Sequence, residues 1–280
     1  MRIRLVSLSI FLLLCGLTLT QTAAAQSYYV ALGDSLAVGY EPISGPPYTQ
    51  GYADDLFALY SPQIPGLALT KLGCVGENTF TMVHGGAPLC PNYPAGSSQL
   101  DAAVAFLQAH QGHVALVTLD IGANDVDGCV STTGIDKSCI ESGFSTVGAN
   151  LPWILRELRQ AAGPHTPIVA MNYYDPFLAA WELGSAGQSI ALKSLAAATD
   201  FNVLLGAIYH AFAVPVADVA QAFRTYNFLP VPGENVPVNV FIILSWTYMA
   251  APAPIGPDIH PNAAGYVAIA GAFAAKVKLP

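Results

Sequence analysis

The stretch Tyr28-Tyr29-Val30-Ala31-Leu32-Gly33-Asp34-Ser35 decides how this chain folds. Its apolar first part has the pattern of a buried strand, and a glycine and two short polar residues follow at once. In open α/β folds, ligands bind at the carboxyl ends of the strands. Ser35 is predicted to lie at such an end, within reach of a bound molecule, and is therefore a candidate nucleophile.

Further apolar runs alternate with helical patterns, which indicates βαβ units around a parallel sheet. We expect strands at residues 28–32, 67–72, 114–121, 168–171 and 214–219. Their nearly continuous apolar character is typical of strands covered on both faces. Helical patterns are found at residues 100–109, 151–158, 185–209 and 263–276, and residues 143–148 are interpreted as a helix start. The apolar stretch 240–250 is interpreted as buried packing, with Trp246 and Tyr248 as its most exposed members; an acyl-binding wall is the alternative.

The first 25 residues have the layout of a secretory signal peptide. Arg2 and Arg4 precede a mostly apolar run, residues 5–19, and three alanines at 23–25 offer small residues for cleavage. The apolar run is shorter than the ~20 residues that a membrane-spanning helix needs, although an uncleaved anchor is the alternative. We therefore expect a secreted protein in which residues 26–280 form a single domain, because no linker or repeat divides them.

Composition and charge exclude several kinds of partner. The chain is 53% hydrophobic and only 10% charged, which predicts a large core. Without Arg2 and Arg4, 8 basic and 18 acidic residues leave a formal charge of −10. Such a surface repels phosphate backbones, so nucleic acid is not an expected partner. We also expect no stable membrane insertion. The glycine-rich motifs of nucleotide cofactors are missing from the sequence, and we expect no cofactor.

Four cysteines follow the predicted signal peptide: Cys74, Cys90, Cys129 and Cys139. An even number in an exported chain predicts two disulfides, with three possible connectivities. The local pairing of Cys74 with Cys90 and of Cys129 with Cys139 is favoured, because each pair brackets a loop rich in Gly, Pro or Ser. Structural zinc is the alternative, but no pair has the usual separation for such a site, so no metal is expected.

A serine nucleophile needs a general base and a group that orients the base. Among the six histidines, His260 is the strongest candidate, because Asp258 lies two residues earlier and Pro261-Asn262 open a helix directly afterwards. His210 falls within a helical pattern instead and is interpreted as a packed core residue.

The nucleophile also needs donors for the oxyanion of the tetrahedral intermediate. Asn124 follows the strand predicted at 114–121, where its amide is placed to donate, although Asn124-Asp125 is equally compatible with a simple turn. Gly76 follows the second predicted strand, where a glycine lets the backbone approach a substrate. A loop glycine that only serves a turn is the alternative there.

Together these positions resemble the SGNH hydrolases, also called the GDSL esterase/lipase family. The matching residues are, in order, Gly33-Asp34-Ser35, Gly76, Gly122-Ala123-Asn124-Asp125 and His260-Pro261-Asn262. The resemblance implies a flavodoxin-like α/β fold, a three-layer α/β/α sandwich with a central parallel five-stranded sheet. It further implies ester hydrolysis through an acyl-enzyme, with Ser35 as nucleophile and His260 as general base. The Ser35 N–H, the Gly76 N–H and the Asn124 side chain would form the oxyanion hole.

One block departs from the family pattern. The usual form is Asp-x-x-His, but Pro257 stands three residues before His260. Asp258 is the nearest acid, and either this carboxylate or a backbone carbonyl orients His260; we favour Asp258 as the third catalytic residue.

The substrate class follows less directly from the sequence than the reaction. Small-molecule, lipid and acylated-glycan esters all fit an acidic exported protein. Aromatic residues near predicted strand ends and the histidine loop favour acyl chains: Tyr40, Tyr173, Tyr174, Phe177, Trp246 and Tyr248. We therefore expect a secreted esterase or lipase. The alternatives are a carbohydrate O-acetylesterase acting on acetylated polysaccharide and a catalytically inactive secreted binding protein of the same fold.

Overall fold

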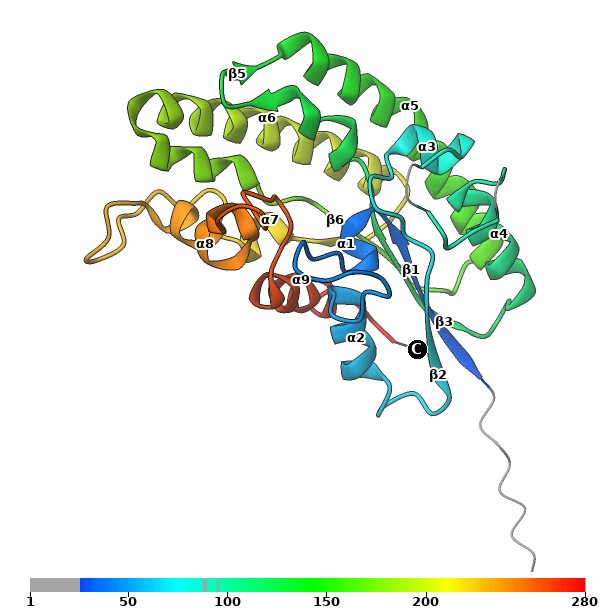
Figure 1. Ribbon diagram of the computed structural model, residues 1–280. Coiled ribbons are helices and arrows are strands. Elements are labelled where there is room, and N and C mark those ends of the chain that lie inside the picture. Colours follow the sequence, from blue (N-terminus) through cyan, green and yellow to red (C-terminus); the bar gives the residue numbers. More distant parts are fainter. Residues whose placement is uncertain (1–25, 88–89, 95, 280) are drawn as a thin grey trace, which may run out of the picture.

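Five parallel strands form the central sheet, in the order β2-β1-β3-β6-β7 (Figure 1). The computed structural model describes residues 26–87, 90–94 and 96–279, so the predicted signal peptide lies outside the described residues. The strands are β1 (Ser27–Gly33), β2 (Leu67–Lys71), β3 (Val114–Asp120), β6 (Ile168–Met171) and β7 (Val216–Ala217). Counted along the sheet, this is the 2-1-3-4-5 order of flavodoxin-like folds, which confirms the predicted fold class.

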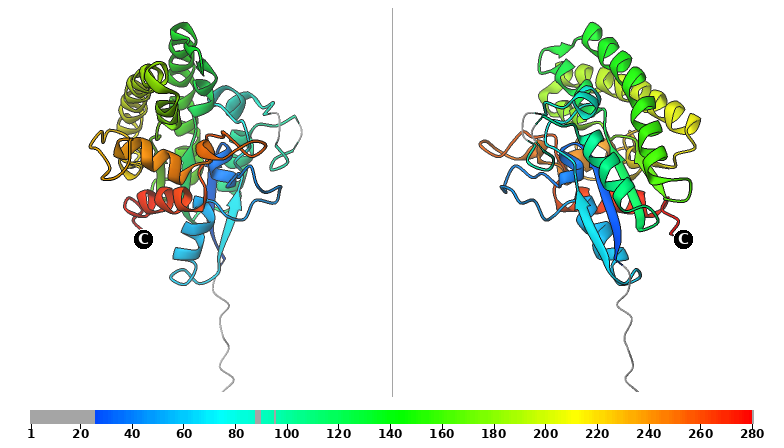
Figure 2. Two further views of the ribbon diagram at one scale, coloured as in Figure 1. Left: turned by 60° about the vertical axis from the view of Figure 1, so that its left-hand side comes forward. Right: turned by 90° about the vertical axis from the view of Figure 1, so that its right-hand side faces the viewer.

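Helices cover both faces of the sheet and complete three layers (Figure 2). One face carries α3 (Thr79–His84), α4 (Gln99–Ala109), α5 (Lys137–Ala162) and α6 (Gly184–Ala211); the other carries α2 (Tyr52–Tyr60), α7 (Val219–Ala222), α8 (Val238–Trp246) and α9 (Ala263–Ala274). Short elements at the ends of strands include α1 (Ser35–Val38), η1 (Ala123–Asp125), η2 (Asp127–Cys129), η3 (Pro176–Leu183) and η4 (Tyr248–Ala250). A hairpin of β4 (Val130–Ser131) and β5 (Gly134–Ile135) follows η2.

The register of the central strands brings the predicted site residues to one edge. β1 lies between β2 and β3, and Gly33 at its end pairs with Asp120 at the end of β3. The loops that follow these two strands, with Ser35 and Asn124, therefore leave the sheet side by side. All five strands of this sheet run parallel, so the loop after β2 leaves the same edge.

Two elements differ from their predicted extent, and a third differs in its predicted burial. β7 is shorter than predicted because Pro215 has no N–H to donate and Asp218 already caps α7. α5 begins at Lys137, well before Gly143, because the Asp136 carboxylate accepts the Cys139 N–H and caps it there. β2 is an edge strand and is half-buried throughout, so the prediction that both faces are covered is wrong for it.

Two predicted burial assignments are also wrong. In the stretch 240–250, Phe241 is 38% exposed, whereas Trp246 and Tyr248 are half-buried. His210 is exposed, and its neighbour Tyr209 is the residue of α6 that enters the core. In both cases the apolar content of the segment did not show which side chains pack against the rest of the protein.

The structure pairs Cys74 with Cys90 and Cys129 with Cys139, the local connectivity that the sequence favours. Within the described ranges, one helical stretch, Pro176–Ala211, is long and apolar enough to cross a membrane by length and composition. Its α6 portion packs against η3 and α5. Core helices of soluble proteins have the same length and composition, so this stretch is weak evidence for a membrane span.

Candidate active site

The turn after β1 places Ser35 at the start of α1. Gly33 has φ +136°, and a Cβ there would lie 1.8 Å from the Asp120 carbonyl oxygen, so glycine is required. The Asp34 carboxylate accepts the Leu36 N–H at 2.9 Å and caps α1. Asp34 therefore shapes the turn, and Ser35 is left with its hydroxyl in the pocket described below.

Ser35, His260 and Asp258 form a continuous chain of hydrogen bonds. His260 Nε2 lies 2.7 Å from Ser35 Oγ, and His260 Nδ1 lies 2.6 Å from Asp258 Oδ1. The same carboxylate oxygen accepts the His260 backbone N–H at 2.9 Å. The structure thus places the carboxylate, rather than a backbone carbonyl, at Nδ1.

Asp258 is held in its charged form by this contact. Burial raises the pKa of its carboxyl, but the hydrogen bonds from the His260 ring and backbone outweigh that effect, and the pKa lies below its ordinary value. A carboxylate that stays ionised accepts the Nδ1 hydrogen and leaves Nε2 free to take a proton from Ser35.

The loop that carries His260 is fastened on two sides. The Tyr174 hydroxyl donates to the Ile259 carbonyl at 2.7 Å, and the Tyr248 N–H donates to the His260 carbonyl at 3.0 Å. The ring of Tyr40 packs on the imidazole with centroids 4.4 Å apart. The imidazole consequently has little freedom to turn away from Ser35.

The predicted oxyanion donors converge on the same edge of the sheet. Asn124 lies in η1 directly after β3, and its Nδ2 donates one hydrogen to the Glu77 carbonyl at 2.8 Å, which leaves the other N–H for a ligand. Among the described residues, neither the Ser35 N–H nor the Gly76 N–H has a hydrogen-bond partner. Gly76 has φ +77°, which turns the chain after β2.

A second pair of contacts ties the Asn124 loop to the Gly76 loop. The Asp125 carboxylate accepts the Thr79 N–H at 2.9 Å and the Thr79 hydroxyl at 2.8 Å. Asn124-Asp125 is therefore more than a turn, because the second residue anchors the first against the neighbouring loop.

A pair of buried acids lies beneath Ser35. Asp120, the last residue of β3, accepts the Asp34 N–H at 3.0 Å and the Ala37 N–H at 3.3 Å, and the Tyr52 hydroxyl donates to its other oxygen. Burial raises the pKa of Asp34 to about 6, and burial together with the Asp34 carboxylate raises that of Asp120. These groups hold the backbone of the serine turn from below.

A pocket opens to solvent beside Ser35, Asn124 and His260. Its walls are mainly apolar, with Val126, Val130, Ile140, Phe144, Tyr173, Tyr174, Phe177, Phe201 and Ile259. Three of the aromatic residues that the sequence places near strand ends are among them. Three acids also line the pocket: Asp34, Asp127 and Asp175. Burial raises the pKa of Asp175 to about 7, and burial together with nearby carboxylates raises that of Asp127 to about 8.

The described part of the chain contains one group of three potential metal ligands, Cys74, Glu77 and Cys90. The two cysteines are bonded to each other, so they offer no thiolate to an ion.

The doubly wound sheet and the Ser35–His260–Asp258 arrangement at its carboxyl edge define the class, an α/β protein with the elements of a serine hydrolase. The chain belongs to the GDSL-like Lipase/Acylhydrolase family, whose model matches residues 31–268. This is a family of ester hydrolases, and the resemblance drawn from the sequence is thereby confirmed.

Solved structures show the same fold. A phospholipase A1 from Streptomyces albidoflavus NA297 has a TM-score of 0.58 at 21% identity, with 90% of this chain and 100% of that chain covered. An extracellular lipase from Streptomyces rimosus has the same TM-score at 19% identity and the same coverage. An acetylxylan esterase from Geobacillus stearothermophilus has a TM-score of 0.51 at 14% identity, with 90% and 94% covered. No curated protein matches the chain significantly.

Several polar residues around the site were not predicted from the sequence. Asp120 carried a signal, since it is a charged residue that ends an apolar strand. No sequence signal pointed to Glu77 or Gln99, because an acid in a loop and an amide at a helix start are ordinary surface residues. Both are completely buried in the structure.

Proposed function

We propose that the protein is a secreted serine esterase or lipase that hydrolyses carboxylic esters through an acyl-enzyme on Ser35. The observation that carries this proposal is the hydrogen-bonded chain from Ser35 Oγ through His260 to Asp258. Nucleophile, base and orienting acid in that order are the requirements for activating a serine hydroxyl. Ser35 and His260 also line a pocket that can hold an acyl group.

In the first half of the reaction, Ser35 Oγ attacks the ester carbonyl carbon while His260 Nε2 takes the hydroxyl proton. The oxygen of the tetrahedral intermediate accepts hydrogen bonds from the Ser35 N–H, the Gly76 N–H and the Asn124 amide. The C–O bond to the alcohol then breaks, and His260 returns its proton to the leaving alkoxide. The products of this half are the free alcohol and the Ser35 acyl ester.

In the second half, water takes the place of the alcohol. His260 removes a proton from water as it attacks the acyl carbon, and then gives that proton to Ser35 Oγ as the carboxylic acid leaves. Asp258 remains ionised throughout; it holds the Nδ1 hydrogen and stabilises the imidazolium that forms twice per turnover.

The apolar pocket supports acyl chains longer than acetyl as substrates. Aliphatic and aromatic side chains form most of its wall, and each buried methylene of a chain gains ~0.8 kcal/mol on transfer from water. A phospholipase and a lipase are among the similar structures, in agreement with this reading. An acetylxylan esterase is also similar, so deacetylation of polysaccharide is the competing outcome of the test.

The test is a substrate series with purified protein. We expect p-nitrophenyl butyrate and octanoate to be cleaved with higher kcat/KM than the acetate, and acetylated xylan to release little acetate. Ser35→Ala serves as the control for contaminating esterases. Preference for acetyl esters and xylan would favour the O-acetylesterase, and an inactive wild type would favour the binding protein.

Secretion is part of the same proposal, together with the assignment of residues 26–280 to one domain. Two disulfides and the signal-like first 25 residues support an extracytoplasmic location. Amino-terminal sequencing of the exported protein should find a start near Gln26, and a start at Met1 would contradict the cleavage.

A further inference from the structure

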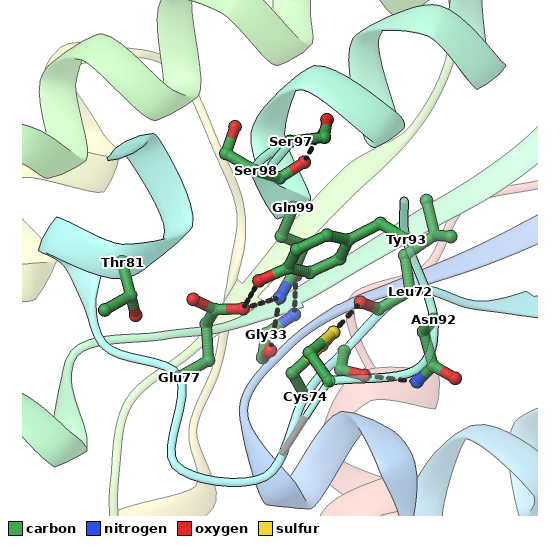
Figure 3. The surroundings of a disulfide bond; sticks show 12 residues. Gly33, Leu72, Cys74, Glu77, Thr81, Asn92, Tyr93, Ser97, Ser98 and Gln99 are labelled. Carbon is green, nitrogen blue, oxygen red and sulfur yellow. Dashed lines mark hydrogen bonds between the residues drawn. A yellow bond between two sulfur atoms is a disulfide. The ribbon is translucent and has the colours of Figure 1, made fainter. Parts of the chain in front are cut away.

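A buried carboxylate, Glu77, lies directly after Gly76 and is completely shielded from solvent. Its Oε2 accepts hydrogen bonds from Gln99 Nε2 at 2.9 Å and from the Tyr93 hydroxyl at 3.0 Å (Figure 3). Its Oε1 has no partner among the described residues. Burial raises the pKa of Glu77. Burying a carboxyl group is unfavourable, so a residue of this kind in a loop after an edge strand calls for an explanation.

The side chain of Glu77 connects to the strand that carries the nucleophile. Gln99 Nε2 donates both to Glu77 and, at 2.8 Å, to the Gly33 carbonyl, while Gln99 Oε1 accepts the Gly33 N–H at 2.7 Å. Gly33 stands two residues before Ser35. Figure 3 shows Gln99 lying between Glu77 and Gly33.

The backbone of Glu77 connects to the other two predicted oxyanion donors. Its carbonyl accepts Asn124 Nδ2 at 2.8 Å, which fixes the plane of that amide. Its own N–H donates to the Cys74 carbonyl at 3.1 Å and closes the turn that presents the Gly76 N–H.

The segment that carries Tyr93 is held against the same loop. Cys90 is bonded to Cys74, and Asn92 Nδ2 donates to the Gly73 carbonyl at 2.6 Å. This places the Tyr93 hydroxyl within hydrogen-bond distance of the Glu77 carboxylate. The loop after β2, the segment that carries Tyr93 and the start of α4 are thus joined at the Glu77 side chain.

From these contacts we infer that Glu77 is a positioning residue for the oxyanion hole, which sets the spacing of the Ser35, Gly76 and Asn124 donors: its side chain acts through Gln99 and Tyr93, and its backbone holds Asn124 and the Gly76 turn. This inference rests on the proposed function, because it assigns Glu77 a role in stabilising the intermediate formed there. The three donors come from three different strand ends, and no single loop can fix their mutual distances.

The size of the effect follows from the geometry of such sites. Oxyanion donors act within ~2.7–3.1 Å of the oxygen, and loss of one costs ~10²–10³ in kcat. A displacement of ~1 Å can cost ~10². Glu77→Ala removes the acceptor of Gln99 and Tyr93 and lets the loops separate, so we expect kcat to fall about 10–100-fold with KM nearly unchanged.

The experiment compares kcat and KM for p-nitrophenyl butyrate with the affinity for a trifluoromethyl ketone, which forms a tetrahedral adduct with serine. Four variants are compared with wild type: Glu77→Ala, Glu77→Gln, Tyr93→Phe and Asp54→Ala. Glu77→Gln keeps an acceptor oxygen for both donors and should retain kcat within about threefold. Tyr93→Phe removes one donor and should lower kcat by about 2–5-fold.

Asp54→Ala is the control for a purely structural role. The Asp54 carboxylate is bonded to Lys71 at 2.6 Å and to the Gly51 N–H, and to none of the three donors, so its loss should lower Tm and leave kcat unchanged. For Glu77→Ala, we expect the ketone affinity to fall by the same factor as kcat. Wild-type kcat in Glu77→Ala, or lower kcat with unchanged ketone affinity, would overturn the inference.

If Glu77→Ala does not fold, Tyr93→Phe tests the inference in its place, because it removes only one hydroxyl from a half-buried side chain. Unchanged kcat and ketone affinity in Tyr93→Phe would also overturn the inference. Failure of the proposed function is distinguishable, because it shows as an inactive wild type or an active Ser35→Ala protein. An active wild type, an inactive Ser35→Ala and a fully active Glu77→Ala would reject the positioning role alone.

Discussion

The two sides of the active site are held in different ways. On the sheet side, Ser35, Gly76 and Asn124 follow three parallel strands, and buried hydrogen bonds between distant segments hold them. On the loop side, His260 is bonded to an acid two residues away on the same exposed loop. The pKa values of the acids also differ between the two sides. Burial raises the pKa of Asp34 and Asp120 on the sheet side, whereas contacts to His260 lower that of Asp258 on the loop side.

The difference indicates a division of labour. On the sheet side, Gly33, Glu77 and Asn124 are hydrogen-bonded to residues distant in sequence, and such partners move only with the fold. The loop side needs only the correct orientation of one imidazole, which a short local bond and packed aromatic rings supply. Substitutions on the sheet side should therefore act through the spacing of the donors, whereas substitutions on the loop side should act through the orientation and tautomer of His260.

The largest expected effect belongs to the residue where the two sides meet. Ser35→Ala removes the nucleophile and should lower kcat for p-nitrophenyl butyrate by about 10⁴-fold or more, because no acyl-enzyme can form. Thermal unfolding should be little changed, since the hydroxyl is small and its main partner is His260. Appreciable turnover by this variant would contradict the assignment of Ser35.

Next in size is the loop side. Asp258→Asn keeps the shape but offers an N–H or a weaker acceptor to Nδ1, which favours the wrong imidazole tautomer. We expect kcat to fall by about 10³–10⁴-fold, with KM and Tm close to wild type. A decrease of less than about threefold would show that Asp258 does not orient His260.

The sheet side is probed by Asn124→Ala. Loss of one oxyanion donor should lower kcat by about 10²–10³-fold while KM stays similar. Asn124 is only half-buried, so the variant should fold. Asp218→Asn offers a control on another strand end, since Asp218 caps α7 far from the donors. A rise in KM with constant kcat would instead mean that Asn124 binds the substrate in its ground state.

The same division explains which parts of the molecule were predictable from the sequence. The strand ends were predictable, because apolar runs followed by Gly33-Asp34-Ser35 or Gly122-Ala123-Asn124 are local patterns. Asp258 was identified because it lies close to His260 in the chain. The pairing of the cysteines was predictable for the same reason, because the two partners of each disulfide lie close together in sequence.

The polar support of the sheet side was not predictable. Gln99 meets Gly33 across 66 positions of sequence and Glu77 across 22, so no local pattern announces either contact. The short β7 and the early start of α5 were missed for another reason. Single capping residues, Asp218 and Asp136, set those boundaries against the apolar pattern.

The smallest expected effect concerns stability and the acids of the sheet side. Asp127 follows β3 in η2 and lines the pocket, and burial, with the carboxylates of Asp34 and Asp175, raises its pKa to about 8. An unfolded aspartate titrates near ~3.9. Between these values the folded protein binds more protons than the unfolded chain, so this group's contribution to stability is present at low pH and is lost as pH rises through about 8.

Asp127→Asn removes that pH dependence while keeping the shape of the side chain. We expect the variant to gain Tm relative to wild type as pH is raised from 5 to 9, by about 2–4 °C for each kcal/mol regained. Asp200→Asn, an exposed position on α6, is the matched control and should show a constant difference. An equally constant difference for Asp127→Asn would mean that Asp127 is already ionised at low pH. Asp127, in the pocket wall, would then lack the raised pKa of the other sheet-side acids, and the contrast with Asp258 would not include it.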